Sequence, residues 1–429
     1  MLPRKTALTI VLFGATMLPV LYWPQIVLKF HNEPKPVAVK PVEPPKPPTP
    51  PIPNLEVPEG SLDRFFNALR RVETRQTGAI VRVLHYGDSP TTADSITADV
   101  RALFQARFGD AGHGFVLIAK PWAWYGHRGI RIDAKNWQIE SASMKRAADR
   151  SHGLGGVNFI GGVGAVSEIR LPDDRHTSVT VHYLKQPDGG AFTISAGETE
   201  LGTVETADGE KAPGFQEFAL PTGTRTVELR VTSGKVRAFG YRFDKPGPGL
   251  QYSSLGINGA QVEMLVRSFQ KDDWRAELRE ENPDLLVLNY GTNESIFPSY
   301  IEKHYPDELR TVLTYLKAAL PETSILVMSP MDRGTLDSNG DIVTPEPLLK
   351  LIAVQRQVAA ELHCAFFNTF AAMGGKGTMG RWYKEEQPRL VSADFMHPLP
   401  AGAAKVGALV ESALVNSYEQ QLPKAVSSR

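Results

Sequence analysis

Hydrophobic residues recur at three- and four-residue spacing in the stretch that begins at Ser61, which predicts an amphipathic helix. The residues at these positions are Leu62, Phe65, Phe66 and Leu69. The run AIVRVLHYG (79–87) is rich in β-branched residues and predicts a buried strand. The run SITADVRALFQARFG (95–109) predicts a second helix, ended by Gly109 because glycine is favoured at helix C-termini. The order helix, strand, turn and helix predicts the start of an α/β domain.

Between about Ile130 and Leu250 the pattern changes to short alternating runs separated by Pro, Gly and Asp. The clearest runs are TSVTVHYL, GAFTISAG, TRTVELRVTSG and VRAFGYRFD. A period of two predicts strands, and short strands of this kind with frequent turns are typical of an antiparallel β-sandwich or jelly roll.

After Gln251 the α/β pattern returns. The runs PDLLVLNYG (283–291) and SILVMSP (324–330) predict buried parallel strands, and LIAVQRQVAAELHCAFFNT (351–369) predicts a helix followed by another strand. We therefore expect a three-layer α/β domain with a flavodoxin-like parallel sheet, interrupted by an inserted β-sandwich.

The N-terminus differs from everything that follows. Thr6 to Leu28 carries no charge and comes directly after Arg4 and Lys5, which predicts a membrane-spanning signal anchor with its N-terminus in the cytoplasm. A cleaved signal peptide is the alternative, although no A-x-A site closes the segment. Eleven prolines lie between Pro34 and Pro58 and predict an extended spacer of roughly 3 Å per residue. Both alternatives place the remainder in the periplasm or outside the cell, anchored to the membrane or secreted.

The chain therefore divides into five predicted segments. These are 1–28, the cytoplasmic tip and anchor; 29–58, the linker; 59–129, the first α/β part; 130–250, the sandwich; and 251–429, the second α/β part.

Composition excludes several classes of function. Lys+Arg and Asp+Glu number 47 each, so no net charge points to nucleic acid or an acidic polymer. Cys364 is the one cysteine, which excludes an intramolecular disulfide and a four-cysteine metal site. No H-E-x-x-H motif occurs and no histidine spacing is typical of a metal site, so we expect neither a metal nor an organic cofactor.

Candidate chemistry lies just after the predicted parallel strands. Ser89 follows the first strand, Gly259 and Asn293 follow two later ones, and Asp394 and His397 lie three residues apart before the C-terminal helix. Parallel α/β sheets gather ligands at the carboxyl ends of their strands. These residue types suit acyl transfer: His397 as base for a Ser89 nucleophile, Asp394 to orient the imidazole. The backbone N–H groups of Ser89 and Gly259 and the Asn293 amide would stabilise an oxyanion.

These blocks, in this order, resemble the SGNH (GDSL-type) hydrolases. A narrower resemblance, to the peptidoglycan O-acetylesterase branch, rests on YGTNES, AAMGGKGTMGRWY and ADFMHP together with the inserted sandwich. Members of that branch are periplasmic and remove acetyl groups from cell-wall glycan. The resemblance implies a Ser89–His397–Asp394 triad acting on an acetylated polysaccharide, most of all peptidoglycan. The chain departs from the branch at Pro90, at Glu294 and in HPLPAGA after the histidine.

Two alternatives and one ambiguity remain open. The first alternative is an O-acetyltransferase for an exported polysaccharide, because an acyl-enzyme can also pass its acetyl group to a sugar hydroxyl. The second is a non-enzymatic, tethered protein that uses the sandwich for glycan binding or as a scaffold. Trp122, Trp124 and Tyr125 are either a platform for sugar rings or a seal at the junction with the insert; Arg381 and Trp382 carry the same ambiguity. The sandwich itself either binds carbohydrate or shapes the cleft.

Overall fold

The computed structural model describes residues 54–422. The predicted signal anchor from Thr6 to Leu28 and most of the linker lie outside these residues. No helix between positions 54 and 422 is long and apolar enough to cross a membrane.

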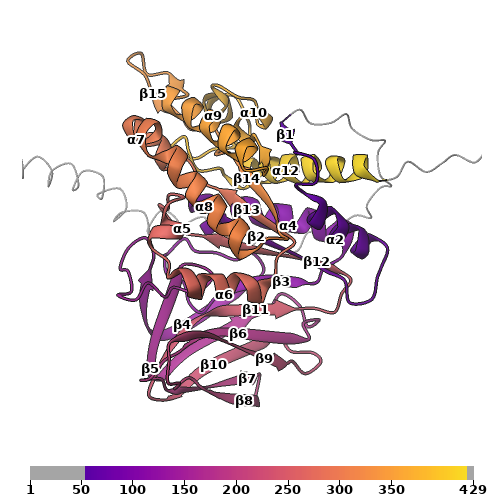
Figure 1. Cartoon of the computed structure of the whole chain (residues 1–429), viewed down its shortest axis with the longest axis vertical. Coiled ribbons are helices and arrows are strands. Elements are labelled where there is room, and N and C mark those ends of the chain that lie inside the picture. Colours follow the sequence, from indigo (N-terminus) through magenta and orange to yellow (C-terminus); the bar gives the residue numbers. More distant parts are fainter. Residues whose placement is uncertain (1–53, 423–429) are drawn as a thin grey trace, which may run out of the picture. The chain divides into compact units, whose positions relative to one another are not determined.

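A mostly parallel sheet of six strands forms the centre of the α/β part (Figure 1). Its order is β1-β17-β14-β13-β2-β12, and all strands are parallel except the short edge strand β1. The bounds are β1 Leu55–Glu56, β2 Ile80–Gly87, β12 Gly249–Gly256, β13 Leu285–Asn289, β14 Ser324–Met328 and β17 Ala365–Phe367. The chain runs outward from β2 in both directions, so the strand order reverses between β2 and β13. Ligands bind at such a switch point in doubly wound sheets.

The two faces of the sheet are covered by different helices, because successive residues of a strand point to opposite sides. In β13, Leu285 and Val287 pack with α2, α4 and α12, whereas Leu286 and Leu288 pack with α6, α8 and α9. The helices are α2 Asp63–Glu73, α4 Ser95–Phe108, α6 Lys271–Glu281, α8 Tyr305–Ala319, α9 Glu346–Glu361 and α12 Pro400–Gln421. The predicted three layers are present.

Short elements connect these layers near the carboxyl ends of the strands. They are α3 Ser89–Thr92, α5 Met264–Arg267, η1 Glu294–Ile296, α7 Pro298–Lys303, α10 Thr369–Ala372, α11 Thr378–Lys384, and the hairpin of β15 Thr335–Leu336 and β16 Ile342–Val343. Gly109 ends α4 with φ +98°, as its sequence position predicted.

The inserted part is an antiparallel sheet of nine strands that follows α4 in the chain. The strands are β3 Gly112–Leu117, β4 Arg131–Ser141, β5 Val157–Arg170, β6 Ser178–Lys185, β7 Ala191–Ala196, β8 Thr199–Glu205, β9 Ala212–Ala219, β10 Thr226–Ser233 and β11 Lys235–Asp244. The first half of β5 pairs with β11 and its second half with β10, so β5 belongs to both halves of the sheet. Buried residues from both halves share one core.

The insert begins earlier than the alternating pattern indicated. Its first strand is β3, which pairs with β11, so the boundary placed at Ile130 lies too late. The run GHGFVL within the first segment is apolar enough for either sheet, and pairing decides the matter. At the other end, β12 already belongs to the parallel sheet from Gly249.

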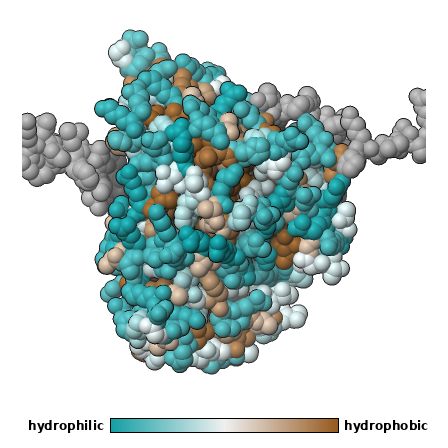
Figure 2. All heavy atoms as spheres, in the orientation of Figure 1, coloured by the Kyte–Doolittle hydropathy of each residue, from teal (hydrophilic) through white to brown (hydrophobic). Residues whose placement is uncertain are grey.

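A buried ionic cluster joins the insert to α6. His182 in β6 lies 2.7 Å from Glu277 and 3.2 Å from Glu281, and Arg242 in β11 lies 3.1 Å from Glu281. Burial alone would lower the pKa of His182, but the two glutamates outweigh it and raise that pKa to about 9. The pairing fixes the insert against the α/β part. The surface drawn in Figure 2 is mostly hydrophilic, with hydrophobic residues in small patches.

Candidate active site

A sharp turn at the end of β2 presents Ser89. Gly87 closes the strand, and a Cβ at that position would lie 2.2 Å from Thr91 Oγ1 and 3.1 Å from the Asn289 carbonyl. Glycine is therefore required where the backbone turns into α3. Ser89 is the first residue of α3, so its N–H has no partner inside the helix. Pro90 lies in the first turn, where proline lacks an N–H that the helix would not use.

The hydroxyl of Ser89 meets His397 across 308 positions of sequence. Ser89 Oγ lies 2.8 Å from His397 Nε2, and His397 Nδ1 lies 2.6 Å from Asp394 Oδ2. The second carboxylate oxygen, Oδ1, accepts hydrogen bonds from the backbone N–H groups of Met396 and His397, both at 3.0 Å, and from Ser392 Oγ at 2.5 Å. The three side chains named in the sequence analysis therefore lie within hydrogen-bonding distance in series. Such a chain of hydrogen bonds orients an imidazole to take a proton from a serine.

The loop that carries Asp394 and His397 is held in a constrained conformation. The N–H of Ser392 donates to the His397 carbonyl at 2.9 Å, and Phe395 adopts a left-handed φ of +57°. The Phe395 ring contacts Tyr383 of α11 edge to face, with centroids 4.8 Å apart. A non-glycine residue persists in this region only when its surroundings hold it there. The packing against α11 therefore supports the position of the imidazole.

The predicted oxyanion residues follow β12 and β13, the two neighbours of β2. Gly259 has φ +68°, a conformation that an L side chain rarely adopts. The side-chain amide of Asn293 donates to the Ala260 carbonyl at 2.9 Å, which leaves its second N–H for another acceptor. The N–H of Ile257 donates to the Gly87 carbonyl at 3.0 Å, which ties this loop to the serine turn.

Glu294 connects the same two loops through a hydrogen bond. Its carboxyl group is fully buried and accepts a hydrogen bond from the Val262 N–H at 2.8 Å. Burial raises the pKa of Glu294 to about 8, so the group is mostly protonated at neutral pH. Sequence reasoning noted this residue only as a departure from the family pattern. The structure assigns it to holding the Gly259 loop beside Asn293.

The charges around the imidazole favour its protonated form. The hydrogen bond to Asp394 raises the pKa of His397 above its ordinary value, and the negative charges of Asp394 and Asp88 act in the same direction. Burial alone would raise the pKa of Asp394, but hydrogen bonds from His397 and Ser392 outweigh it and hold that pKa well below its usual range. Burial raises the pKa of Asp88 to about 6.

The five residues predicted to contact substrate fall into two groups. Trp124 and Arg381 have exposed side chains. Trp122, Tyr125 and Trp382 are buried in the hydrophobic cores, at 8%, 4% and 3% exposure, which leaves their rings no open face for a sugar. For these three the platform interpretation is corrected to packing. Arg381 donates to the carbonyls of Gly374 and Lys376 and so closes its own loop.

The loop that carries Trp124 contacts the serine helix. Two positions further on, Gly126 donates its N–H to the Thr92 carbonyl at the end of α3, at 3.2 Å. Trp124 is 45% exposed. Ile296 and Phe297, which directly follow the Asn293 turn, are also more than half exposed. Exposed apolar side chains therefore flank the turn that carries Ser89 and the turn that carries Asn293.

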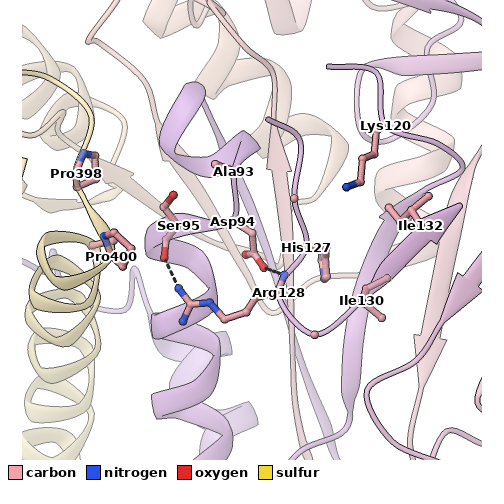
Figure 3. A pocket seen from close by; sticks show the side chains of 13 residues that line it. Ala93, Asp94, Ser95, Lys120, His127, Arg128, Ile130, Ile132, Pro398 and Pro400 are labelled. Atoms are coloured by element: carbon pink, nitrogen blue, oxygen red, sulfur yellow. Dashed lines mark hydrogen bonds between the residues drawn. The ribbon is translucent and has the colours of Figure 1, made fainter. Parts of the chain in front are cut away.

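A hollow of about 460 Å³ is lined by residues that follow Ser89 and His397 in the chain, although no triad residue is part of its lining (Figure 3). Its walls come from three separate segments: Ala93–Ser95 after the serine helix, Pro398, Pro400 and Ala403 after His397, and residues 120–132 before and within β4. Sequence reasoning missed this hollow, since its lining residues carry no shared pattern. Among positions 54–422, no three or more His, Cys, Asp and Glu side chains are grouped to hold a metal ion.

Comparison with known proteins gives a family match for part of the chain and a shared fold. Residues 227–405 match the model of the GDSL-like Lipase/Acylhydrolase family, a span that holds Gly259, Asn293, Asp394 and His397 but not Ser89. No curated protein sequence matches the chain. A solved structure described as a peptidoglycan O-acetylesterase in action aligns with a TM-score of 0.72 at 22% identity, covering 83% of this chain and 96% of that one.

Other solved structures align less well. A family two carbohydrate esterase from Clostridium thermocellum aligns with a TM-score of 0.30 at 10% identity, covering 67% of this chain and 99% of its own. A GDSL-like lipase from Parabacteroides merdae aligns with a TM-score of 0.30 at 20% identity, covering 39% and 74%. The family model therefore matches residues 227–405 to the GDSL-like Lipase/Acylhydrolase family, and the chain shares its fold with the first structure.

Proposed function

We propose that this hydrolase is a serine esterase that removes O-acetyl groups from an acetylated polysaccharide outside the cytoplasm, namely peptidoglycan. The observation that carries the proposal is the hydrogen-bonded series Ser89 Oγ, His397 and Asp394, with heavy-atom distances of 2.8 and 2.6 Å. A serine in this setting attacks a carbonyl carbon, because the imidazole accepts its proton as the bond forms.

In the first half of the reaction, Ser89 Oγ attacks the acetyl carbonyl while His397 Nε2 takes the hydroxyl proton. Asp394 keeps Nδ1 protonated and stabilises the resulting imidazolium. The tetrahedral intermediate then collapses, and the bond to the sugar oxygen breaks. His397 returns its proton to that oxygen, which leaves as a free sugar hydroxyl and leaves an acetyl ester on Ser89.

In the second half, water replaces the sugar. His397 removes a proton from the attacking water, the hydroxide equivalent adds to the acetyl carbon, and the Ser89 oxygen leaves with the proton from His397. Acetate is released and the enzyme returns to its starting state. No group outside the triad, the substrate and water takes part in the balance.

The developing negative charge on the carbonyl oxygen needs fixed donors. The N–H groups of Ser89 and Gly259 and the second N–H of Asn293 fill this role in our proposal. They come from the carboxyl ends of three adjacent strands, β2, β12 and β13. Donors held before the reaction starts stabilise an oxyanion without reorganisation.

The choice of substrate has separate support. The structure with TM-score 0.72 bears the name of a peptidoglycan O-acetylesterase, and an identity of 22% carries the fold to this chain. The uncharged segment Thr6 to Leu28 and the proline-rich stretch after it predict export to the compartment that holds peptidoglycan. Trp124 is exposed in the loop whose Gly126 contacts α3, and in our proposal its ring packs against a sugar.

The test is acetate release from O-acetylated peptidoglycan by the full chain and by Ser89→Ala, with a small aryl acetate beside it. We expect the wild type to release acetate from the glycan and the variant to release none above background. Serine-dependent cleavage of the aryl acetate without release from peptidoglycan would retain the esterase and reject the substrate.

A further inference from the structure

We propose that Arg333 binds the lactyl substituent of the acetylated sugar, through the carboxylate or amide carbonyl at the end of that substituent. The inference rests on the proposed function and specifies its substrate. In peptidoglycan the acetylated unit is itself the muramyl sugar, and its lactyl ether distinguishes it from the glucosaminyl units of chitin. Arg333 lies in the loop between β14 and β15, at the carboxyl edge of the parallel sheet.

Hydrogen bonds connect this loop to both turns that carry catalytic groups. The Arg333 side chain donates to Ser295, which lies two residues after Asn293. The next residue, Gly334, donates its N–H at 2.8 Å to the carbonyl of Phe395, in the loop that holds the catalytic imidazole. Two residues of chain span at most about 7 Å. Arg333 therefore borders the site on the side where the turn of β13 and the imidazole loop meet.

Ser295 fixes one edge of the Arg333 guanidinium and leaves the other edge free. Nε donates to Ser295 Oγ at 2.8 Å, and Nη2 donates to the Ser295 carbonyl at 3.1 Å. Of the five N–H groups of a guanidinium, one on Nη2 and both on Nη1 remain. These have no hydrogen-bond partner of good geometry among residues 54–422, and Nη1 is not sealed from solvent. At this free edge the N–H groups form the fork that binds a carboxylate or a carbonyl.

Arg333 is the exception among the arginines that the fold buries. Four arginines between positions 54 and 422 are less than a tenth exposed, namely Arg101, Arg237, Arg242 and Arg333. The first three contact carboxylates at 2.6, 2.6 and 3.1 Å. For Arg333, which is 8% exposed, no carboxylate of the described residues lies within ion-pair distance. Buried charges are normally paired because desolvation of an isolated charge is costly. A ligand oxygen would supply the missing partner.

The acidic neighbour of Arg333 in the chain is engaged elsewhere. Asp332 accepts hydrogen bonds from Thr344 Oγ1 at 2.7 Å and from the Met379 N–H at 3.0 Å. Burial lowers the pKa of Arg333 below its ordinary value, and the negative charge of Asp332 opposes this change. A guanidinium stays protonated in proteins. Its positive charge is therefore available to a ligand.

The two segments that meet at Arg333 also expose apolar side chains. Ile296 and Phe297 directly follow Ser295 and are more than half exposed, and Leu336, three residues after Arg333, is 61% exposed. Sites for small ligands combine apolar surface with a few placed polar groups. A fixed guanidinium with apolar side chains nearby fits a sugar ring that carries a substituent ending in a carboxyl group or its amide.

The experiment compares the wild-type full chain with Arg333→Met, Arg333→Lys and the control Arg237→Met. Arg237 is equally buried, at 7% exposure, but it contacts Asp149 in the inserted part. Two substrates carry the lactyl group: O-acetylated peptidoglycan, where it ends in an amide, and the same strands after amidase treatment, where it ends in a carboxylate. Two substrates lack it: chemically O-acetylated chitin oligosaccharides and a small aryl acetate.

We expect Arg333→Met to raise KM about tenfold on both forms of peptidoglycan, with kcat little changed, and to leave kcat/KM on the other two substrates near the wild-type value. Arg333→Lys keeps the charge without the fork and should recover part of the loss. Arg237→Met should lower the thermal stability and keep KM. A larger effect on amidase-treated strands identifies the carboxylate as the preferred group, and a larger effect on intact strands identifies the amide carbonyl.

A second measurement uses the unaltered protein and so does not depend on the folding of a variant. N-acetylmuramic acid and N-acetylglucosamine differ by the lactyl group alone. We expect the first to inhibit hydrolysis of the aryl acetate at a several-fold lower concentration than the second. In Arg333→Met, if thermal unfolding shows it to be folded, the two sugars should inhibit equally.

Two failures are distinguishable. Equal inhibition of the wild type by the two sugars, or a loss in Arg333→Met that is as large on the aryl acetate as on peptidoglycan, overturns binding of the lactyl group by Arg333 and leaves the proposed function standing. Absence of acetate release from both forms of peptidoglycan by the wild type overturns the proposed function, whatever the two sugars do.

Discussion

The triad and the segment that leads into the insert differ in how their polar groups are paired. In the triad, both ring nitrogens of His397 form hydrogen bonds, and one oxygen of Asp394 accepts three. In the segment before the insert, Lys120 has no acidic partner and the ring nitrogens of His127 have no hydrogen-bond partner of good geometry among residues 54–422. The groups assigned to the reaction are therefore held by hydrogen bonds within the protein, whereas Lys120 and His127 have no such support. Variants of the held groups should accordingly lower kcat more than they change KM.

The strongest test of the triad is whether Ser89 and His397 act as a unit. Ser89→Ala and His397→Ala should each lower kcat by about 10⁶-fold, and the double variant should lose no more than either single one. The measurement is the steady-state rate on an aryl acetate. Losses that multiply in the double variant would show that the two side chains act independently.

Asp394→Asn should lower kcat by about 10⁴-fold, because the imidazole loses its orientation and the stabilisation of its charge. Activity of the wild type falls as pH drops through the pKa of His397, which Asp394 raises above its ordinary value. The variant removes that cause, so the acidic limb of its kcat/KM profile should move to lower pH. The exposed Asp133→Asn is the matched control and should leave the profile in place. An acidic limb that stays put in Asp394→Asn would contradict the assignment.

Asn293→Ala should lower kcat by about 10²- to 10³-fold with a small change in KM, since its free N–H is needed only as the oxyanion forms. Loss of its hydrogen bond to the Ala260 carbonyl will also loosen the Gly259 loop. A variant that raises KM and keeps kcat would instead place Asn293 among the groups that bind the ground state.

Two tryptophans separate a residue that stabilises the fold from one proposed to bind the glycan. Trp382 is buried in the core, so Trp382→Ala should lower the free energy of unfolding by about 3–5 kcal/mol. Trp124 is half exposed, so Trp124→Ala should leave unfolding nearly unchanged and raise KM for the glycan several-fold. Chemical denaturation and glycan kinetics on both variants decide this. The reverse pattern would restore Trp382 as a sugar platform.

The smallest effect is expected from Glu294→Gln. The pKa of Glu294 is about 8 in the folded protein and near 4.5 in the unfolded chain, so the folded state binds the extra proton between these values. Stability from this group is therefore present at low pH and is lost as pH rises from about 4.5 through 8. Glutamine does not titrate, so the Tm of the variant relative to wild type should rise by a few degrees from pH 5 to pH 8. A constant difference would contradict the buried, protonated carboxyl.

Much of the sheet and the meeting of Ser89 with His397 could be predicted, because parallel strands end at one edge and short polar loops follow them. The run 79–87 became β2 and 283–291 became β13 for this reason. Assignment of β3 could not be predicted, because its apolar sequence suits either sheet and its partner β11 lies far along the chain.

The sequence also did not predict which aromatic residues are buried or where the hollow lies. A tryptophan in a loop-like sequence, such as Trp382, does not reveal which way its ring turns until α11 packs against the core. The hollow joins Lys120, Ala93 and Pro398 from three separate stretches, and only the folded chain brings them together.

The most direct test of the central claim is to trap the acetyl group on the enzyme. The full chain is mixed with O-acetylated peptidoglycan, quenched in acid within the first turnover and digested, and its peptides are analysed by mass spectrometry. The account predicts one acetyl group on Ser89 itself, absent from the Ser89→Ala protein. Release of acetate by that variant at the wild-type rate, or an acetyl group on another side chain, would contradict it.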